Sequence, residues 1–169
     1  TAVFFASDDC HVSLSKAHRI MGLKDESLQK IPIDRNGELD ISFLYSNLKK
    51  IESEGKKCFA VVATAGTTVR GAVDPLPSIA EFCQKENIWL HIDGAIGGMF
   101  GLSKSTSEIV HGVSSADSIT INPQKLLGIA KTSSLLLVAN KNHLFSTFST
   151  GLPYTEPTSG NDFHGGELG

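Results

Sequence analysis

The chain has 169 residues, of which 40% are hydrophobic and 20% are charged, and its formal net charge is −3. This is the composition of a globular domain, and the absence of a basic stripe or a block of like charges gives no reason to expect a nucleic acid or a membrane as a partner. Cys10, Cys58 and Cys83 are odd in number and lie outside any CxxC pair, so no disulfide framework or metal site is expected, and a reducing, cytoplasmic setting fits.

The first half of the chain alternates between predicted strands and helices. Residues 2–6 are predicted to be a strand, residues 13–21 a helix closed by a glycine, and residues 28–33 a short apolar run before the turn DRNGE. A predicted helix at 43–53 leads to residues 58–63, CFAVVA, a continuous apolar run of the kind found in buried parallel strands.

The second half repeats this alternation and then loses it. Residues 77–87 are predicted to form a crossover helix, and residues 88–93, 118–121 and 134–139 to form strands. Beyond Asn140 the apolar period fades into a segment rich in Gly, Pro, Ser and Thr, which predicts a mobile loop. The pattern predicts an α/β fold with a mostly parallel sheet and flanking helices.

The chain is expected to be an interior piece of a longer protein, because it opens in a strand-like run and stops in a loop-like one. Residues 1–145 are predicted to be the cofactor-binding part, and residues 146–169 a mobile segment that carries a catalytic residue.

Asp93 is a candidate site residue because it ends an apolar strand and is followed by small residues in HIDGAIGG. Open α/β sheets bind ligands at the carboxyl ends of their strands. An ionised carboxylate there could keep a pyridine nitrogen protonated. The alternative is an aspartate that caps the following turn through its short side chain.

Lys125 is the second candidate, in the segment INPQKLLG just after the predicted strand at 118–121. Its apolar neighbours predict partial desolvation, which favours the neutral amine that a nucleophilic lysine needs. The alternative is a lysine whose stem packs against the surface while its ammonium group reaches water.

These segments together resemble a known family. HIDGAIGGM, ADSITINPQKLLG, SDDCHVSLSKAHRIMGL and VVATAGTTVRGAVDPL are similar to four blocks of the group II pyridoxal-dependent amino-acid decarboxylases. The resemblance implies the large domain of PLP fold type I, as in aspartate aminotransferase, with pyridoxal 5'-phosphate (PLP) as cofactor. It also implies a homodimer and an amino-acid substrate.

The resemblance assigns roles by position. It implies that Lys125 forms the Schiff base and that Asp93 contacts the pyridine nitrogen. It implies that His11 stacks on the cofactor ring, that Ala95 is the small residue on the other ring face and that Thr64 lies near the ring hydroxyl. It also implies that Asn122 and Gln124 are neighbours of the phosphate. His11 has an alternative as a side chain that begins a helix.

Tyr154 and Gln124 are two further positions to which the resemblance assigns a role. Tyr154 lies in a Gly- and Pro-flanked segment where the family's mobile loop carries a tyrosine that protonates the α-carbon, and the alternative is an exposed loop tyrosine without a role. Gln124 stands where the family usually has histidine, and an amide can still donate a hydrogen bond to a phosphate oxygen.

The predicted function is PLP-dependent decarboxylation of an L-amino acid to the amine and carbon dioxide. Two alternatives stay open: another PLP-dependent lyase or oxidative deaminating reaction on the same scaffold, and a non-catalytic remnant of such an enzyme. The chain alone is expected to be inactive, because the segment that supplies most phosphate donors in the family and its carboxyl-terminal domain are not in it.

Overall fold

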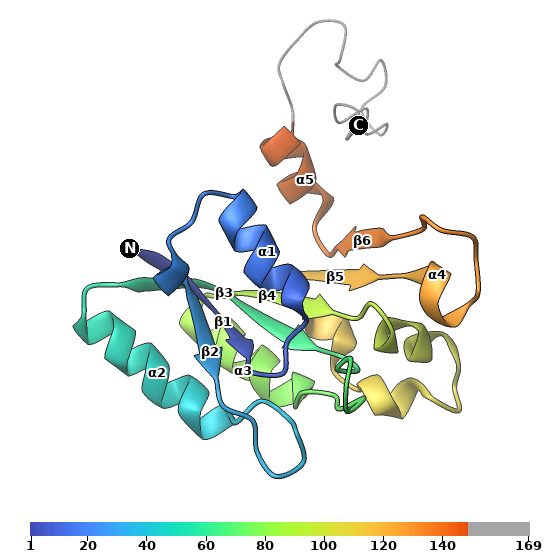
Figure 1. Cartoon of the computed structure of the whole chain (residues 1–169), viewed down its shortest axis with the longest axis horizontal. Coiled ribbons are helices and arrows are strands. Elements are labelled where there is room, and N and C mark those ends of the chain that lie inside the picture. Colours follow the sequence, from blue (N-terminus) through green and yellow to red (C-terminus); the bar gives the residue numbers. More distant parts are fainter. Residues whose placement is uncertain (149–169) are drawn as a thin grey trace, which may run out of the picture. The chain divides into compact units, whose positions relative to one another are not determined.

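A single six-stranded sheet organises the structure, a computed structural model that describes residues 1–148 (Figure 1). The strand order is β2-β1-β3-β4-β5-β6, and the pairs β1–β2, β1–β3, β3–β4 and β4–β5 are parallel. The strands are β1 (Ala2–Ser7), β2 (Leu28–Ile31), β3 (Lys57–Thr64), β4 (Trp89–Asp93), β5 (Ser118–Ile121) and β6 (Leu135–Val138). The predicted α/β fold with a mostly parallel sheet is confirmed.

Helices connect the strands. The α-helices are α1 (Val12–Ile20), α2 (Ile41–Ser53), α3 (Leu76–Glu86), α4 (Pro123–Leu126) and α5 (Lys141–Phe148). Short 3-10 helices are η1 (Asp25–Ser27), η2 (Gly97–Leu102), η3 (Ser107–Val110) and η4 (Val113–Ser115).

Helices α2, α4 and α5 differ from the prediction by more than one residue, and no helix was expected at α4. α2 begins two residues before the predicted start, because the Asp40 side chain caps it by accepting hydrogen bonds from the backbone N–H groups of Ser42 and Phe43. Residues 141–148 form helix α5, so the prediction of a loop directly after Asn140 is wrong for them.

The chain divides into two units, Thr1–Leu137 and Val138–Gly169. The first holds β1 to β5 and most of β6, and the described part of the second holds the end of β6 and helix α5. The functional boundary expected at residue 145 is a different kind of division and stays a prediction.

The order of the strands places the helices on both faces of the sheet. The chain leaves β1 for β2 on one side, then crosses back to β3 and β4 on the other side of β1. Because parallel crossovers are right-handed, this reversal puts α1 on one face and both α2 and α3 on the opposite face (Figure 1). The reversal point, between β1 and β3, is where such sheets bind ligands at their carboxyl edge.

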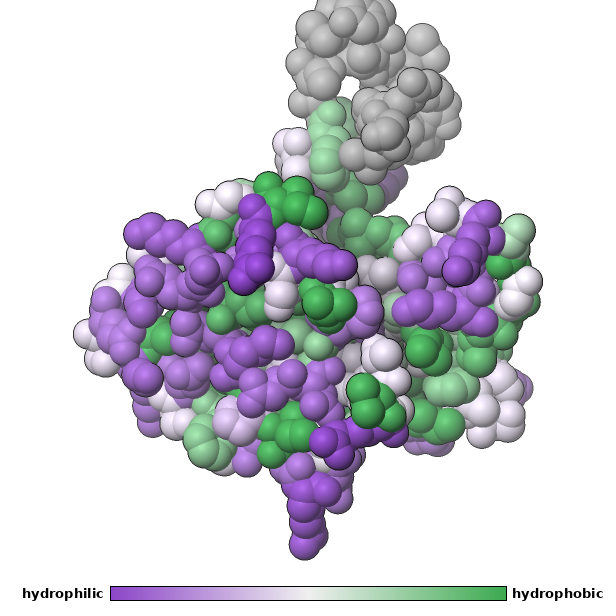
Figure 2. All heavy atoms as spheres, viewed as in Figure 1, coloured by the Kyte–Doolittle hydropathy of each residue, from purple (hydrophilic) through white to green (hydrophobic). Residues whose placement is uncertain are grey.

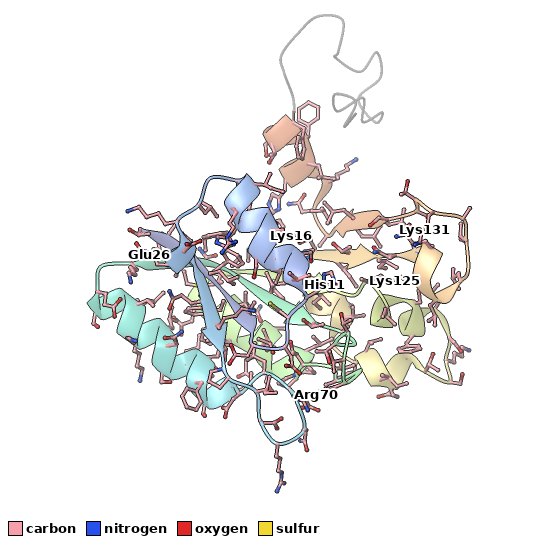
Figure 3. All side chains as sticks on the ribbon, viewed as in Figure 1. His11, Lys16, Glu26, Arg70, Lys125 and Lys131 are labelled. Carbon is pink, nitrogen blue, oxygen red and sulfur yellow. The ribbon has the colours of Figure 1, made fainter. Side chains whose placement is uncertain are left out.

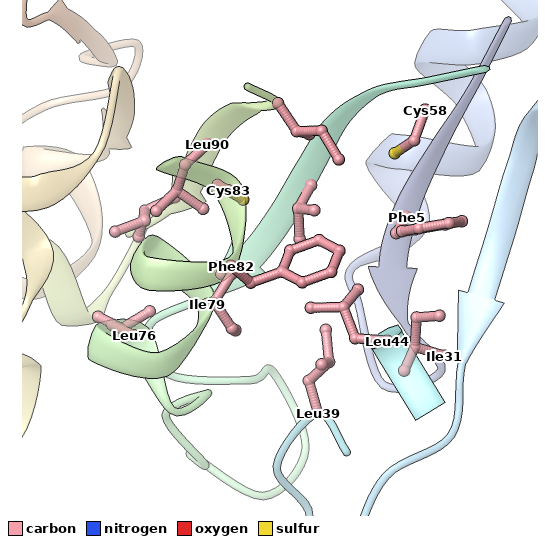
Figure 4. Packing of buried hydrophobic residues seen from close by; sticks show 14 of the residues in the cluster. Phe5, Ile31, Leu39, Leu44, Cys58, Leu76, Ile79, Phe82, Cys83 and Leu90 are labelled. Carbon is pink, nitrogen blue, oxygen red and sulfur yellow. The ribbon is translucent and has the colours of Figure 1, made fainter. Parts of the chain in front are cut away.

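The larger core lies between the sheet and helices α2 and α3. Figure 4 shows Phe82 and Ile79 of α3 packed with Phe5 of β1 and Leu44 of α2, and all four side chains are inaccessible to solvent. The opposite face, under α1, buries only the small cluster Phe4, Ala6, Ala60 and Val62. The lighter packing under α1 leaves room for a cavity farther along the strands.

The surface carries both polar and apolar residues. On the face shown in Figure 2, hydrophilic residues cover much of the surface and hydrophobic residues form smaller areas between them. Leu135, Leu136 and Leu137 of β6 are each about half exposed. No helix among residues 1–148 is long and apolar enough to cross a membrane.

Asp74 joins the end of β3 to the loop before α2. Its two carboxylate oxygens accept hydrogen bonds from the backbone N–H groups of Leu39 at 2.8 Å and Thr64 at 2.7 Å. The residue is only 2% exposed, and this burial raises the pKa of Asp74 from 3.8 to about 6, against the lowering effect of the two hydrogen bonds. Thr64, one of the predicted site residues, is thus held through a buried acid.

This acid should make stability depend on pH. Because the pKa of Asp74 is raised in the folded state, its contribution to the free energy of unfolding is fully present below about pH 4 and is lost as pH rises through about 6. A shift of this size corresponds to about 3 kcal/mol. Urea unfolding between pH 4 and 7 should show the decline.

Asp74→Asn should flatten that decline, even though asparagine retains only one acceptor oxygen and lowers the absolute stability. Asp34→Asn is the matched control, because Asp34 also accepts two backbone N–H groups but is only partly buried. An unchanged pH dependence in the Asp74 variant would contradict the assignment.

Candidate active site

A cavity of about 290 Å³ opens at the carboxyl ends of β3, β4 and β5, in the unit Thr1–Leu137. Six of the predicted site residues line it, namely His11, Thr64, Asp93, Ala95, Asn122 and Lys125. Figure 3 shows His11 at the start of α1 and Lys125 on α4. Residues from the start of α1, from β3, β4 and β5 and from α4, far apart in the sequence, are therefore brought to one place.

The register of the sheet explains why three of the lining side chains meet. Thr64 of β3 pairs with Asp93 of β4, and Asp93 pairs with Thr120 of β5. Paired residues on neighbouring strands project to the same face. This row crosses the carboxyl edge of the sheet on the α1 side, where the packing is light.

Asp93 combines the two alternatives considered from the sequence. Its Oδ1 accepts a hydrogen bond from the Ala95 backbone N–H at 3.2 Å, so it does cap the following turn. Its side chain also lines the cavity. Asp93 therefore caps the turn and lines the cavity at the same time.

Thr64 brings an unsatisfied hydroxyl to the cavity. The residue is 3% exposed, and its Oγ1 has no hydrogen-bond partner among residues 1–148. A buried hydroxyl without a partner costs free energy unless a ligand or water satisfies it. The geometry therefore favours a ligand with a polar group at this point.

His11 also combines its two alternatives. It is the N-cap residue of α1, and its Nδ1 accepts a hydrogen bond from the Ser13 backbone N–H at 3.2 Å. Because Nδ1 is the acceptor, the proton of the neutral ring lies on Nε2. The exposed ring nevertheless lines the cavity, so helix capping orients it there.

His91 contributes to the cavity without contacting Asp93 by a hydrogen bond. Its Nδ1 lies 2.8 Å from the Ser118 hydroxyl and its Nε2 lies 3.3 Å from the Thr120 hydroxyl, and the Trp89 indole N–H also donates to Ser118. Burial lowers the pKa of His91, and the nearby Asp93 carboxylate opposes that effect. His91 is therefore a neutral imidazole held between two hydroxyl groups.

Lys125 does not lie in the apolar setting predicted for it. The residue is exposed, and its neighbours Leu126 and Leu127 are 47% and 54% exposed. The short helix α4 turns these side chains away from the described core. Lys125 therefore reaches the cavity as an accessible amine, and the desolvation expected from the sequence is wrong for residues 1–148.

Gln124 points elsewhere than predicted. Its Oε1 accepts a hydrogen bond from the Ser133 backbone N–H at 2.6 Å, and Gln124 is not among the residues that line the cavity. Asn122 does line it and accepts a hydrogen bond from the Ser134 hydroxyl at 2.8 Å. Tyr154 lies outside the described residues, and its role stays a prediction.

Several lining residues were not predicted from the sequence. They include four hydroxyl side chains, Ser13, Thr68, Thr120 and Ser134. Thr120 could have been found from the two-residue period of its strand once its register with Asp93 was known, whereas Ser134 carries no local signal. Among residues 1–148, no group of three or more His, Cys, Asp or Glu could hold a metal ion.

The cavity wall depends on a close backbone contact. Gly97 donates its N–H to the Ala65 carbonyl at 3.0 Å, and a Cβ at position 97 would collide with that carbonyl oxygen and lie 2.8 Å from its carbon. Ile96 and Gly66, which flank these two residues, line the cavity. Only glycine lets the two segments approach this closely.

Gly97→Ala should lower the free energy of unfolding by about 1–3 kcal/mol, because backbone atoms must move apart. Urea unfolding measures this. Gly101→Ala in the same 3-10 helix is the control, since its Cβ would meet only a Val110 methyl at 3.8 Å. Equal free energies of unfolding for the two variants would show that the backbone around Gly97 can move apart without a measurable cost.

Comparison with known proteins identifies the family. The pyridoxal-dependent decarboxylase conserved domain matches residues 1–164, nearly the whole chain. The chain therefore belongs to the pyridoxal-dependent decarboxylase family. The resemblance seen in the sequence blocks is confirmed.

Individual relatives agree with this. The chain is 39% identical to cysteine sulfinic acid decarboxylase of Rattus norvegicus over 140 residues, covering 83% of the chain and 28% of the relative. It is 35% identical to aromatic-L-amino-acid decarboxylase of Bacillus atrophaeus over 160 residues, covering 95% and 33%. The crystal structure of mouse CSAD superposes with a TM-score of 0.86 at 34% identity, covering 92% and 33%. The chain spans about a third of the length of these proteins.

The cavity residues fit PLP, the cofactor of this family. The unsatisfied Thr64 hydroxyl offers a partner for a polar ring substituent, and the Asp93 carboxylate suits a protonated ring nitrogen. Lys125 supplies an accessible primary amine on the same cavity. Oxygen and amide groups of Ser13, Thr68 and Asn122 add polar contacts.

Proposed function

We propose that this chain is the cofactor-binding part of an enzyme that decarboxylates an L-amino acid to the corresponding amine and carbon dioxide. The observation that supports this most is the meeting of Asp93, Thr64 and Lys125 at one cavity on the carboxyl edge of the sheet. Family membership supplies the reaction class, since the relatives named above are amino-acid decarboxylases.

Each residue has a distinct proposed task. When bound, PLP supplies an electron-withdrawing ring that accepts the electron pair released as carbon dioxide leaves. Asp93 holds the proton on the ring nitrogen, and the Thr64 hydroxyl bonds the ring's own hydroxyl. Lys125 provides the amine for covalent attachment of the cofactor.

The remaining proposed tasks concern the faces and edges of the ring. His11 supplies an aromatic face at the mouth of the cavity, with its orientation set by the bond from Ser13, and Ala95 leaves space on the other side. Asn122 contacts the phosphate. Tyr154 returns a proton to the α-carbon, which its counterpart's position in the family supports.

The working protein is proposed to be a cytoplasmic homodimer. Cysteines that form neither a pair nor a metal cluster among the described residues fit a reducing compartment. β6 exposes three consecutive leucines, as expected of a strand that further protein covers. Such a cover can come from the remaining length of the enzyme or from a second subunit.

The test is product analysis with the protein that contains this chain, supplied with PLP and a panel of acidic and aromatic L-amino acids. Carbon dioxide and amine in equal amounts are expected. An aldehyde with peroxide would replace the proposal by oxidative deamination on the same scaffold. Covalent cofactor binding without turnover of any amino acid would support a non-catalytic remnant.

A further inference from the structure

The segment around Lys125 has little structure of its own to hold it. Helix α4 is a single turn, closed by backbone bonds from Lys125 to the Asn122 carbonyl and from Leu127 to the Pro123 carbonyl. A helix of one turn is unstable in isolation, because nucleation fixes several dihedral angles for few hydrogen bonds. Residues 125–132 include Gly128 at φ +64°, and most of their side chains are exposed.

Two side-chain bonds close this segment at its base. Gln124 Oε1 accepts from the Ser133 backbone N–H at 2.6 Å, and Asn122 Oδ1 accepts from the Ser134 hydroxyl at 2.8 Å. Asn122 and Gln124 before the loop are thereby hydrogen-bonded to Ser134 and Ser133 after it. Asn122 is itself anchored to the cavity wall, because its N–H donates to the Ala95 carbonyl at 3.3 Å.

We propose that Gln124 is a positioning residue that clamps the loop after Lys125 and so holds the Lys125 amine at the cavity. This inference rests on the proposed function. It replaces the expectation that Gln124 serves the phosphate directly. The amide oxygen is a neutral acceptor with the length to reach across the loop, and its bond to Ser133 belongs to the protein without any cofactor.

The clamp explains how a one-turn helix can present a lysine reproducibly. Without the Ser133 bond, Asn122–Ser134 would be the remaining one of these two side-chain bonds across the base of the loop, and that pair is exposed. Exposed hydrogen bonds compete with water and hold a segment weakly. The partly buried Gln124 bond is therefore expected to contribute more to the position of Lys125.

Gln124→Met and Gln124→Glu separate the two possible roles. Methionine has similar length but no oxygen to accept the Ser133 N–H, whereas a glutamate carboxylate still accepts it. In the protein containing this chain and without cofactor, amide hydrogen exchange at Ser133 should be about five- to tenfold faster in Gln124→Met, as expected for one hydrogen bond. Gln124→Glu should remain within about twofold of the unchanged protein on the same grounds.

A second measurement links the clamp to the site. With PLP added, the rate of borohydride-fixed attachment to Lys125 should fall in Gln124→Met and recover in Gln124→Glu. Gln29→Met is the matched control. It removes an amide that also makes a hydrogen bond to backbone, from Gln29 Nε2 to the Glu26 carbonyl at 2.6 Å, but at the start of β2 and outside the cavity lining. It should leave both readouts unchanged.

Two results would overturn the proposal. Unchanged hydrogen exchange at Ser133 in Gln124→Met would show that the bond between Gln124 and Ser133 does not stabilise the loop. Equal loss of cofactor attachment in both Gln124 variants, with Ser133 still protected in Gln124→Glu, would show that Gln124 acts on the phosphate instead. Failure of the proposed function is distinguishable, because the unchanged protein would then attach no cofactor while Ser133 exchange stays readable.

Discussion

Asp93→Asn is expected to weaken PLP binding by about 10- to 100-fold, since a hydrogen bond to a charged group contributes about 1.5–3 kcal/mol. Asparagine has the same shape and keeps an oxygen that can accept the Ala95 N–H, so the turn after β4 should survive. The negative charge is lost, and an NH2 group replaces the other carboxylate oxygen. The variant therefore separates the capping role of Asp93 from its proposed electrostatic role.

The measurement is a PLP titration followed by absorbance, together with urea unfolding of the cofactor-free protein. Stability should change little while affinity falls. Asp25→Asn is the control, because Asp25 is 85% exposed and lies away from the cavity lining. Unchanged cofactor affinity in Asp93→Asn would reduce Asp93 to a turn cap.

Lys125→Ala is expected to abolish covalent attachment of PLP completely and to reduce carbon dioxide release by about 10³-fold or more, since a positioned amine is lost from the reaction. Absorbance before and after borohydride reduction, with mass analysis of the labelled peptide, measures the attachment. The fold should be unaffected, because Lys125 is exposed and its side chain has no core contacts to lose.

Lys131→Ala is the matched control for this experiment. Lys131 is also exposed and lies on the same loop but outside the cavity lining, so its replacement should leave attachment intact. Attachment that survives in Lys125→Ala and disappears in Lys131→Ala would move the proposed covalent link to the other lysine.

Much of the sheet could be predicted from the sequence, because buried parallel strands need continuous apolar runs. The runs CFAVVA and IWLHID correspond to β3 and β4 with shifts of one residue at their ends. The start of α2 was less predictable, since it depends on which way the Asp40 side chain turns. α5 was missed because KNHLFSTF has a weak apolar period.

The site was predictable where it follows strand ends and unpredictable where it depends on the loops. Asp93 and Thr64 end neighbouring strands, so their meeting follows from the parallel register. The partner of Gln124 lies nine residues away across a loop, and no sequence period relates the two. The surroundings of Lys125 were misjudged for a similar reason, because apolar neighbours on a one-turn helix need not face the core.

The place of β1 between β2 and β3 has a consequence for how the molecule folds. β1 comes first in the sequence, yet its second neighbour, β3, begins only at Lys57. Until that strand has been synthesised, β1 lacks its β3 partner, and an unpaired strand edge is open to incorrect partners. The cavity needs still later residues, up to Ser134. Such non-local pairing slows folding, so the cofactor site is among the last parts of this unit to form.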